Sequence, residues 1–185
     1  KNHPEILESL IGKEYDKSLF ALQKANSSGV FFLLDATVNP ALDSASNSKS
    51  GLYIKNMEPN ILSSSSEFLL ILRGSSSIGR QNNVTLHPQW RMEFDVTDAP
   101  YYHAPVDAAR SLDLPISRLF YWSEAITLPG TTEQVMLCSA PLVDSKGNVF
   151  GVCGFEVSAM LFKLTHMPNE SVSQRLICIM APGSD

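Results

Sequence analysis

The sequence predicts an α+β domain in which a long N-terminal helix packs on a central antiparallel sheet of about five strands. Three observations support this prediction. The chain has 185 residues, of which 44% are hydrophobic, enough for one sizeable core. Apolar residues recur at helical spacing in the first 26 residues. Short apolar runs bounded by turn residues dominate the remainder.

The N-terminal segment, residues 1–26, is expected to form one helix of about 20 residues. Its apolar side chains stand three and four positions apart, which places them on one stripe. Pro4 suits the first turn, and the polar residues 27–29 are expected to end the helix. The apolar stripe consists of Ile6, Leu7, Leu10, Ile11, Tyr15, Leu19 and Leu22.

The next part of the chain reads as short strands separated by polar loops. Each expected strand is a run of apolar or β-branched residues, and each loop is rich in Ser, Asn, Asp or Gly. The expected strands are 30–34, 52–57 and 67–73, the loops are 39–50 and 74–83, and a short helix covers 105–112.

The clearest unit is a β-hairpin over residues 133–157. Its turn runs from Asp144 to Gly147, and this glycine favours a three-residue loop closed by a glycine bulge. Both faces of the hairpin are largely apolar, so both are expected to be covered. The N-terminal helix is the expected cover of one face.

The register of that hairpin predicts a recess with an acidic wall. Met136 would oppose Glu156, and Cys138 would oppose Gly154, so all four positions share one face. Gly154 removes a side chain beside Glu156, whose carboxylate would need a cationic partner if it is buried. The alternative is that Glu156 lies near the strand end and reaches solvent or an arginine.

The same register separates two cysteines. Cys138 would point into the recess and Cys153 toward the helix, so no disulfide is expected between them. A four-residue loop would instead place the two cysteines directly opposite each other, close enough to bond.

Composition limits the function classes. The net charge is −5, which argues against nucleic acid as a partner because phosphate binding needs a basic face. No apolar run approaches the roughly 20 residues of a membrane span. Cysteine and histidine spacing predicts no metal site, and no cofactor is expected. The sequence also lacks the common catalytic motifs, so an enzyme is not expected.

Four motifs in the second half resemble the Cache family, the extracytoplasmic PAS-like sensor domains of bacterial membrane receptors. They lie between residues 98 and 157 and follow the family order. They are PYYHAP (100–105), YWSEAI (121–126), SAPLVDSKGNVFGV (139–152) and GVCGFEV (151–157). The resemblance implies a PAS-like sheet with a ligand pocket, and no catalytic residue.

The resemblance implies roles for individual residues of this chain. Tyr101 and Tyr102 match an aromatic pair that lines the pocket in many members, and Trp122 and Glu124 match the next segment. Glu156 stands where many members hold a ligand amine with Asp. The predicted ligand-binding residues are Tyr101, Tyr102, Arg118, Tyr121, Trp122, Glu124, Met136, Cys138 and Glu156.

Departures from the family pattern limit the classes of ligand that we expect. The arginine that usually precedes the aromatic pair is replaced by residues 98–100, Asp-Ala-Pro. An amine-bearing or uncharged small molecule therefore fits better than an ordinary α-amino acid. Arg118 remains a candidate clamp for a carboxylate.

The resemblance implies a sensor that lies outside the cytoplasm in a membrane-anchored signal transducer of histidine kinase, chemoreceptor or cyclase type. Its partners would be the ligand, its own transmembrane helices and a cytoplasmic output domain, with a homodimer through the N-terminal helix. We expect a helix at 1–26, the ligand-binding domain at 27–165, and a closing strand or second module at 166–185. Because the chain begins at Lys1, we expect it to be a piece of a longer one. The alternatives are a protein-interaction or dimerisation module with a vestigial pocket, and a cytoplasmic PAS-like domain.

Overall fold

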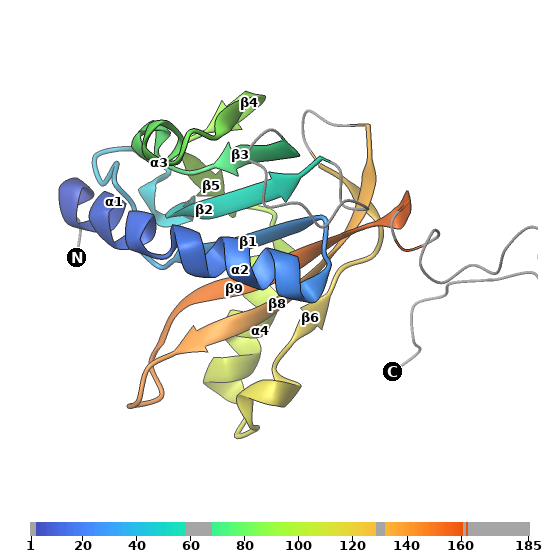
Figure 1. Ribbon diagram of the computed structural model, residues 1–185. Helices are drawn as coiled ribbons and strands as arrows, with labels where there is room; N and C mark the ends of the chain where they lie inside the picture. Colours follow the sequence, from blue (N-terminus) through green and yellow to red (C-terminus); the bar gives the residue numbers. More distant parts are fainter. Residues whose placement is uncertain (1–2, 58–67, 129–131, 161, 163–185) are drawn as a thin grey trace, which may run out of the picture.

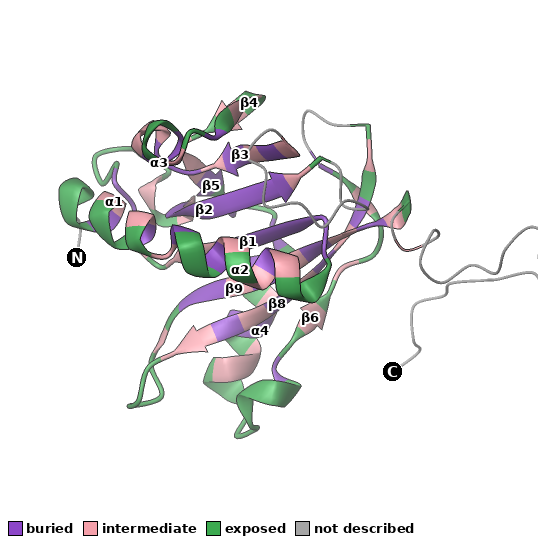
Figure 2. Cartoon of the chain, viewed as in Figure 1, coloured by how far each residue is buried: buried purple, intermediate pink, exposed green. Residues whose placement is uncertain are grey.

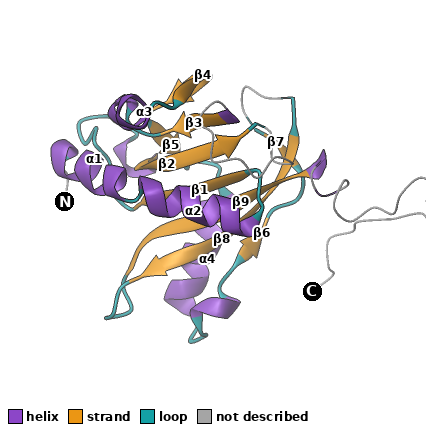
Figure 3. Cartoon of the chain, viewed as in Figure 1, coloured by secondary structure: helices purple, strands orange, loops and turns teal. Residues whose placement is uncertain are grey.

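The computed structural model describes residues 3–57, 68–128, 132–160 and 162. These residues form four α-helices and a nine-stranded mixed sheet, which confirms the predicted α+β class (Figures 1 and 3). The expected segment 166–185 lies outside the described residues.

Helices lie on both faces of the sheet (Figure 1). The helices are α1 (Pro4–Lys13), α2 (Tyr15–Ala25), α3 (Ser76–Asn82) and α4 (Pro100–Ser111), with short 3-10 turns at Ala45–Asn47 and Ile116–Arg118. The strands are β1 (Gly29–Leu34), β2 (Ser48–Asn56), β3 (Leu69–Arg73), β4 (Thr85–Arg91), β5 (Glu93–Asp95), β6 (Tyr121–Trp122), β7 (Ile126–Thr127), β8 (Gln134–Val143) and β9 (Val149–Ser158).

The sheet has the order β4-β3-β2-β1-β9-β8-β6, with β5 paired to β2 and β7 paired to β8. Its five central strands, β2-β1-β9-β8-β6, are all antiparallel, as the sequence predicts. The predicted sheet was too small, however, because β4 adds to β3 in parallel and two short strands pair at its margins.

The prediction of one long N-terminal helix is wrong, because this segment forms two helices, α1 and α2, which are separated at Glu14. The backbone N–H of Glu14 bonds to Ile11 and Gly12 rather than continuing the α pattern. Ser18 then donates its hydroxyl to the Glu14 carbonyl at 2.8 Å, a bond that bends helices. The segment ends at Asn26, which adopts the left-handed conformation just before the predicted stop.

Two further segments differ from the prediction. The expected loop 74–83 contains α3, which Ser75 caps by accepting a hydrogen bond from the N–H of Ser77 at 3.3 Å. The expected short helix begins earlier, because Pro100 suits a first-turn position and starts α4.

Each face of the sheet has its own core. On one face α1, α2 and α3 cover β1, β2 and β3, and on the other α4 packs against β8 and β9. Figure 2 shows that α1 and α2 cross the front of β1, whereas no described helix crosses the front of β8. Among the described residues, only the face beneath α4 therefore has the full cover that was expected for both faces of the hairpin.

The hairpin turn agrees with the prediction, but the strand register beyond it does not. Asp144 donates its N–H to Asn148, and Gly147 has a φ of 82°. A bulge at Phe150 then shifts the register by one residue. Because the side chains of both faces are apolar, the sequence pattern does not oppose this slip.

The shift changes which side chains share a face. Glu156 opposes Leu137, whereas Cys138 opposes Phe155, so Met136 and Cys138 lie on the face opposite to Glu156. Cys138 and Cys153 are free thiols, as predicted, but they share one face, so the predicted reason for their separation is wrong.

Candidate ligand cavity

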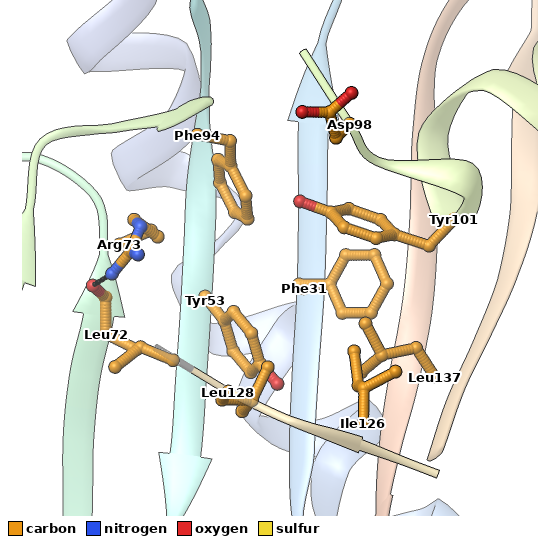
Figure 4. A pocket seen from close by; sticks show the side chains of 10 residues that line it. All are labelled: Phe31, Tyr53, Leu72, Arg73, Phe94, Asp98, Tyr101, Ile126, Leu128 and Leu137. Carbon is orange, nitrogen blue, oxygen red and sulfur yellow. Dashed lines mark hydrogen bonds between the residues drawn. The ribbon is translucent and has the colours of Figure 1, made fainter. Parts of the chain in front are cut away.

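A cavity of about 210 Å³ lies between the sheet and the segment that leads from β5 into α4 (Figure 4). It opens on the face where α4 packs, away from α1 and α2. Its lining residues come from six strands, from the start of α4, and from the segments that precede α4 and follow β7. They are Phe31, Tyr53, Leu72, Arg73, Phe94, Asp98, Tyr101, Ile126, Leu128 and Leu137.

Four of the ten lining residues are aromatic, and their rings contact one another. The Phe31 ring packs edge-on against Tyr101, with centroids 5.7 Å apart, and tilted against Tyr53 at 5.5 Å. Tyr53 in turn stacks on Phe94 at 6.4 Å. Such a wall favours an apolar or aromatic ligand body.

Tyr101 is the one predicted ligand residue that lines this cavity. Ser139 on β8 donates its hydroxyl to the Tyr101 carbonyl at 2.7 Å, which fixes the start of α4 over the sheet. The Tyr101 hydroxyl points across β1 in Figure 4. Burial raises the pKa of Tyr101 to about 12, so the phenol stays protonated and can donate a hydrogen bond at neutral pH.

Arg73 supplies the cationic group of the cavity. One of its nitrogens, Nη1, donates to the carbonyl of Leu72 at 2.7 Å. Among the described residues, no carboxylate forms an ion pair with this guanidinium. Burial lowers the pKa of Arg73, but an arginine remains charged at neutral pH. As far as the described residues go, most of its donors are therefore available to an anionic or acceptor group.

Glu156 has a structural partner instead of a ligand. It is fully buried, and its carboxylate accepts hydrogen bonds from the Tyr53 hydroxyl, the Lys55 ammonium and the Ser28 hydroxyl, the last at 2.8 Å. Lys55 is buried as well and also pairs with Glu133 at 3.0 Å. Burial raises the pKa of Tyr53 strongly, as does the neighbouring carboxylate. Neither the predicted ligand role of Glu156 nor its solvent-exposed alternative agrees with this network.

Two glycines explain the network and the lost recess. Gly29 lies between Lys55 and Glu156 across the sheet, so the two charged side chains meet over a position without a side chain. Gly154 was expected to leave a recess, but the Phe31 ring fills that space. A Cβ atom at Gly154 would overlap this ring and the carbonyl oxygen of Cys138.

Tyr102 points away from the cavity. Its hydroxyl donates to Asp35 at 3.2 Å, and its ring lies beneath the ammonium of Lys49, 5.6 Å from the ring centroid. Burial and the Asp35 carboxylate raise the pKa of Tyr102. Tyr102 does not line this cavity, because its side chain joins α4 to the sheet, and its ligand role stays a prediction.

The other predicted ligand residues lie elsewhere. Arg118 and Glu124 are exposed, and Tyr121 pairs with Ser139 without lining the cavity. Trp122 opposes Cys138 and is exposed on the uncovered face. Met136 and Cys138 lie on that same face because of the register shift.

Sequence reasoning missed most of the cavity wall. Arg73 had a recognisable signal, because it ends an otherwise apolar strand, LLILR. Asp98 was noticed only as a departure from the family pattern, yet it stands at the exposed rim of the cavity. Phe31 and Tyr53 carried no signal that distinguishes a cavity wall from a packed core.

The described part of the chain contains no group of three or more His, Cys, Asp or Glu side chains suited to a metal ion. None of its helices has the length and apolar character that crossing a membrane requires.

Comparison of the chain with protein-family models, curated proteins and solved structures finds no match. The resemblance to the Cache family therefore stays a prediction, and the cavity itself is the main evidence about function.

Proposed function

We propose that this chain is a PAS-like, small-molecule-sensing domain that binds its ligand in the cavity beside Arg73 and Tyr101. The observation that supports the proposal is the cavity of about 210 Å³, which is lined by four aromatic residues and by Arg73, whose guanidinium donates to one backbone carbonyl among the described residues. An apolar cavity of about 150 Å³ accepts a benzene molecule, so this one suits a ligand of similar or slightly larger size.

The lining chemistry favours a ligand with an apolar body and one anionic or hydrogen-bond-accepting end. The rings of Phe31, Tyr53 and Phe94 would contact the body, and Arg73 would bind the polar end. Glu156, which was expected to bind a ligand amine, is already bonded to Lys55 and is therefore a poor partner for an amine. Asp98 at the rim is the carboxylate that remains for an amine.

A signalling role extends the same proposal. The antiparallel core β2-β1-β9-β8-β6 supports a PAS-like arrangement, and α1 and α2 pack on the sheet face opposite the cavity. A ligand that binds one packing of the sheet more tightly would shift the balance between two states. In this proposal α1 and α2 pass that shift to a membrane span and output domain, with the sensing domain outside the cytoplasm.

The second candidate is a protein-interaction or dimerisation module. It is favoured by the apolar side chains on the front of β8 and β9, much of which no described helix covers.

A thermal-shift screen with matched cavity variants tests the proposed site. A ligand from a library of small acids, amines and neutral aromatics should stabilise the chain, by about 2.7 kcal/mol at 100 times its dissociation constant. Ile126→Trp should abolish that stabilisation, because the side chain at 126 lines the cavity. Thr127→Trp, the neighbouring exposed position, is the control and should keep it. Absence of any stabilising compound, or full stabilisation of Ile126→Trp, would contradict the proposal.

A further inference from the structure

Two arginines lie on neighbouring strands beside the ligand cavity. Arg73 ends β3 and Arg91 ends β4, and the two residues are partners in the parallel pairing of these strands. On its other side Arg73 is the partner of Tyr53 on β2, and Tyr53 lines the cavity. Because paired residues of neighbouring strands share a face of the sheet, both arginines belong to the cavity face.

Two hydrogen bonds hold the ends of β3 and β4 together. The N–H of Gly74 donates to the carbonyl of Arg91 at 3.2 Å, and the indole N–H of Trp90 donates to the carbonyl of Gly74 at 2.9 Å. Arg91 is therefore fixed beside the residue that follows Arg73. Neighbouring strands lie about 4.8 Å apart, so the two guanidiniums can reach one group placed between them.

No acid neutralises this pair of arginines within the part of the chain that the structure describes. Neither guanidinium has a carboxylate at ion-pair distance. The carboxylate of Asp95 accepts hydrogen bonds from the N–H and the hydroxyl of Thr97, at 3.0 and 2.6 Å. These bonds lower the pKa of Asp95, and Arg91 does so to a smaller extent. Burial lowers the pKa of Arg73, and so does the charge of Arg91, because the two cations repel each other.

The positive potential extends along β4 to His87. Burial lowers the pKa of His87, and so do the charges of Lys55 and Arg73, so this imidazole is neutral at pH 7. Its Nδ1 accepts the N–H of Gln89 at 3.1 Å, which leaves the proton on Nε2 as a donor. Positive charges gathered without an acid between them are unfavourable by themselves, and such an arrangement attracts anions.

We propose that the polar end of the ligand carries two negative charges, as in a phosphate monoester, and that Arg73 and Arg91 bind it together. This inference rests on the proposed ligand site, because Arg73 lines the cavity that would hold the apolar body. Arg91 is exposed and lies outside the cavity lining, so the phosphate would sit at the mouth, between the two side chains. Guanidinium groups match the oxygens of a phosphate in geometry and charge.

The acidic residue of the cavity leaves this position free. Figure 4 shows Asp98 and Arg73 at opposite margins of the cavity, with Asp98 next to Tyr101. The carboxylate of Asp98 therefore does not stand between the two arginines.

Phenyl phosphate and phenyl sulfate are matched probes of this inference. They have nearly the same shape, but at about pH 7.5 the phosphate carries two negative charges and the sulfate one, because the second pKa of a phosphate ester is about 6. Isothermal titration should show phenyl phosphate binding at least about tenfold more tightly, the contribution of one further charge-assisted hydrogen bond. Arg91→Gln should remove this preference by weakening phosphate binding alone. Arg73→Gln should weaken the binding of both compounds.

Arg80→Gln is the matched control, because Arg80 is exposed on α3, which packs on the other face of the sheet. It should keep the preference for phosphate, and circular dichroism would verify that each variant is folded. Equal affinity for the two compounds, or a preference that survives Arg91→Gln, would overturn the inference and leave the proposed cavity intact. Absence of binding by both compounds would also overturn it, and absence of benzoate binding as well would contradict the proposed ligand site itself.

Discussion

The side chains on the two faces of the β8–β9 hairpin differ in how far they are buried. On the cavity face, Leu137, Ser139 and Val152 are buried beneath α4 and the segment before it. On the other face, where no described helix crosses β8, the alternating neighbours Met136 and Cys138 remain half-exposed. Alternation along one strand thus separates a face that contributes to the cavity from a face that has less cover among the described residues.

The cavity face also contains two contrasting charged groups. Glu156 is fully buried, and its carboxylate is bonded to Lys55, Tyr53 and Ser28, so it has little capacity left for a ligand. Arg73 is half-buried and donates to one backbone carbonyl among the described residues. A buried charge with all its bonds satisfied is structural, whereas an accessible charge with spare donors suits a ligand.

Removing the Glu156 carboxylate should have the largest effect on stability. Glu156→Ala should lower the free energy of unfolding by about 3–5 kcal/mol, because it leaves the Lys55 ammonium buried beside a single remaining acidic partner. Urea denaturation followed by circular dichroism measures the change. The control Glu124→Ala removes an exposed carboxylate and should change stability by less than about 0.5 kcal/mol. Near-wild-type stability of Glu156→Ala would show that the network is not structural.

Truncating two neighbouring side chains of β8 tests whether its two faces are buried to different extents. Leu137→Ala should cost about 2–5 kcal/mol, because this side chain is buried in the core beneath the cavity. Met136→Ala, one position earlier, should cost about 1 kcal/mol or less, because its side chain is half-exposed on the opposite face of β8. Urea denaturation at low protein concentration compares the two variants directly. Equal losses would indicate that both faces of β8 are equally buried.

The sequence predicted the class and the central strands because those depend on local periodicity. The run at 30–34, the Asp144–Gly147 turn and the paired strands of the hairpin all have strong local signals, and all are present. The register beyond the turn was not predictable, because one extra residue at Phe150 is compatible with apolar side chains on both faces. That single residue moved Met136 and Cys138 out of the expected site.

The cavity was only partly predictable for a related reason. Tyr101 was found through its motif, whereas Phe31 and Arg73 reach the cavity from segments far away in the sequence. The partner of Glu156 depends on the pairing of β2 with β1 and of β1 with β9, which brings Lys55 across Gly29. No local pattern encodes such a contact between three strands.

The central claim is that Arg73, and not Glu156, provides the charged contact to the ligand. Isothermal titration with benzoate, benzamide and benzylamine tests it most directly, because the three share a ring and differ in charge. Wild-type protein should bind benzoate more tightly than benzamide, and benzylamine most weakly. Arg73→Gln should weaken benzoate binding by about 10- to 100-fold, the value of a charge-assisted hydrogen bond, while the exposed control Arg80→Gln leaves it unchanged. Tightest binding of benzylamine, or benzoate affinity unaffected by Arg73→Gln, would contradict the account.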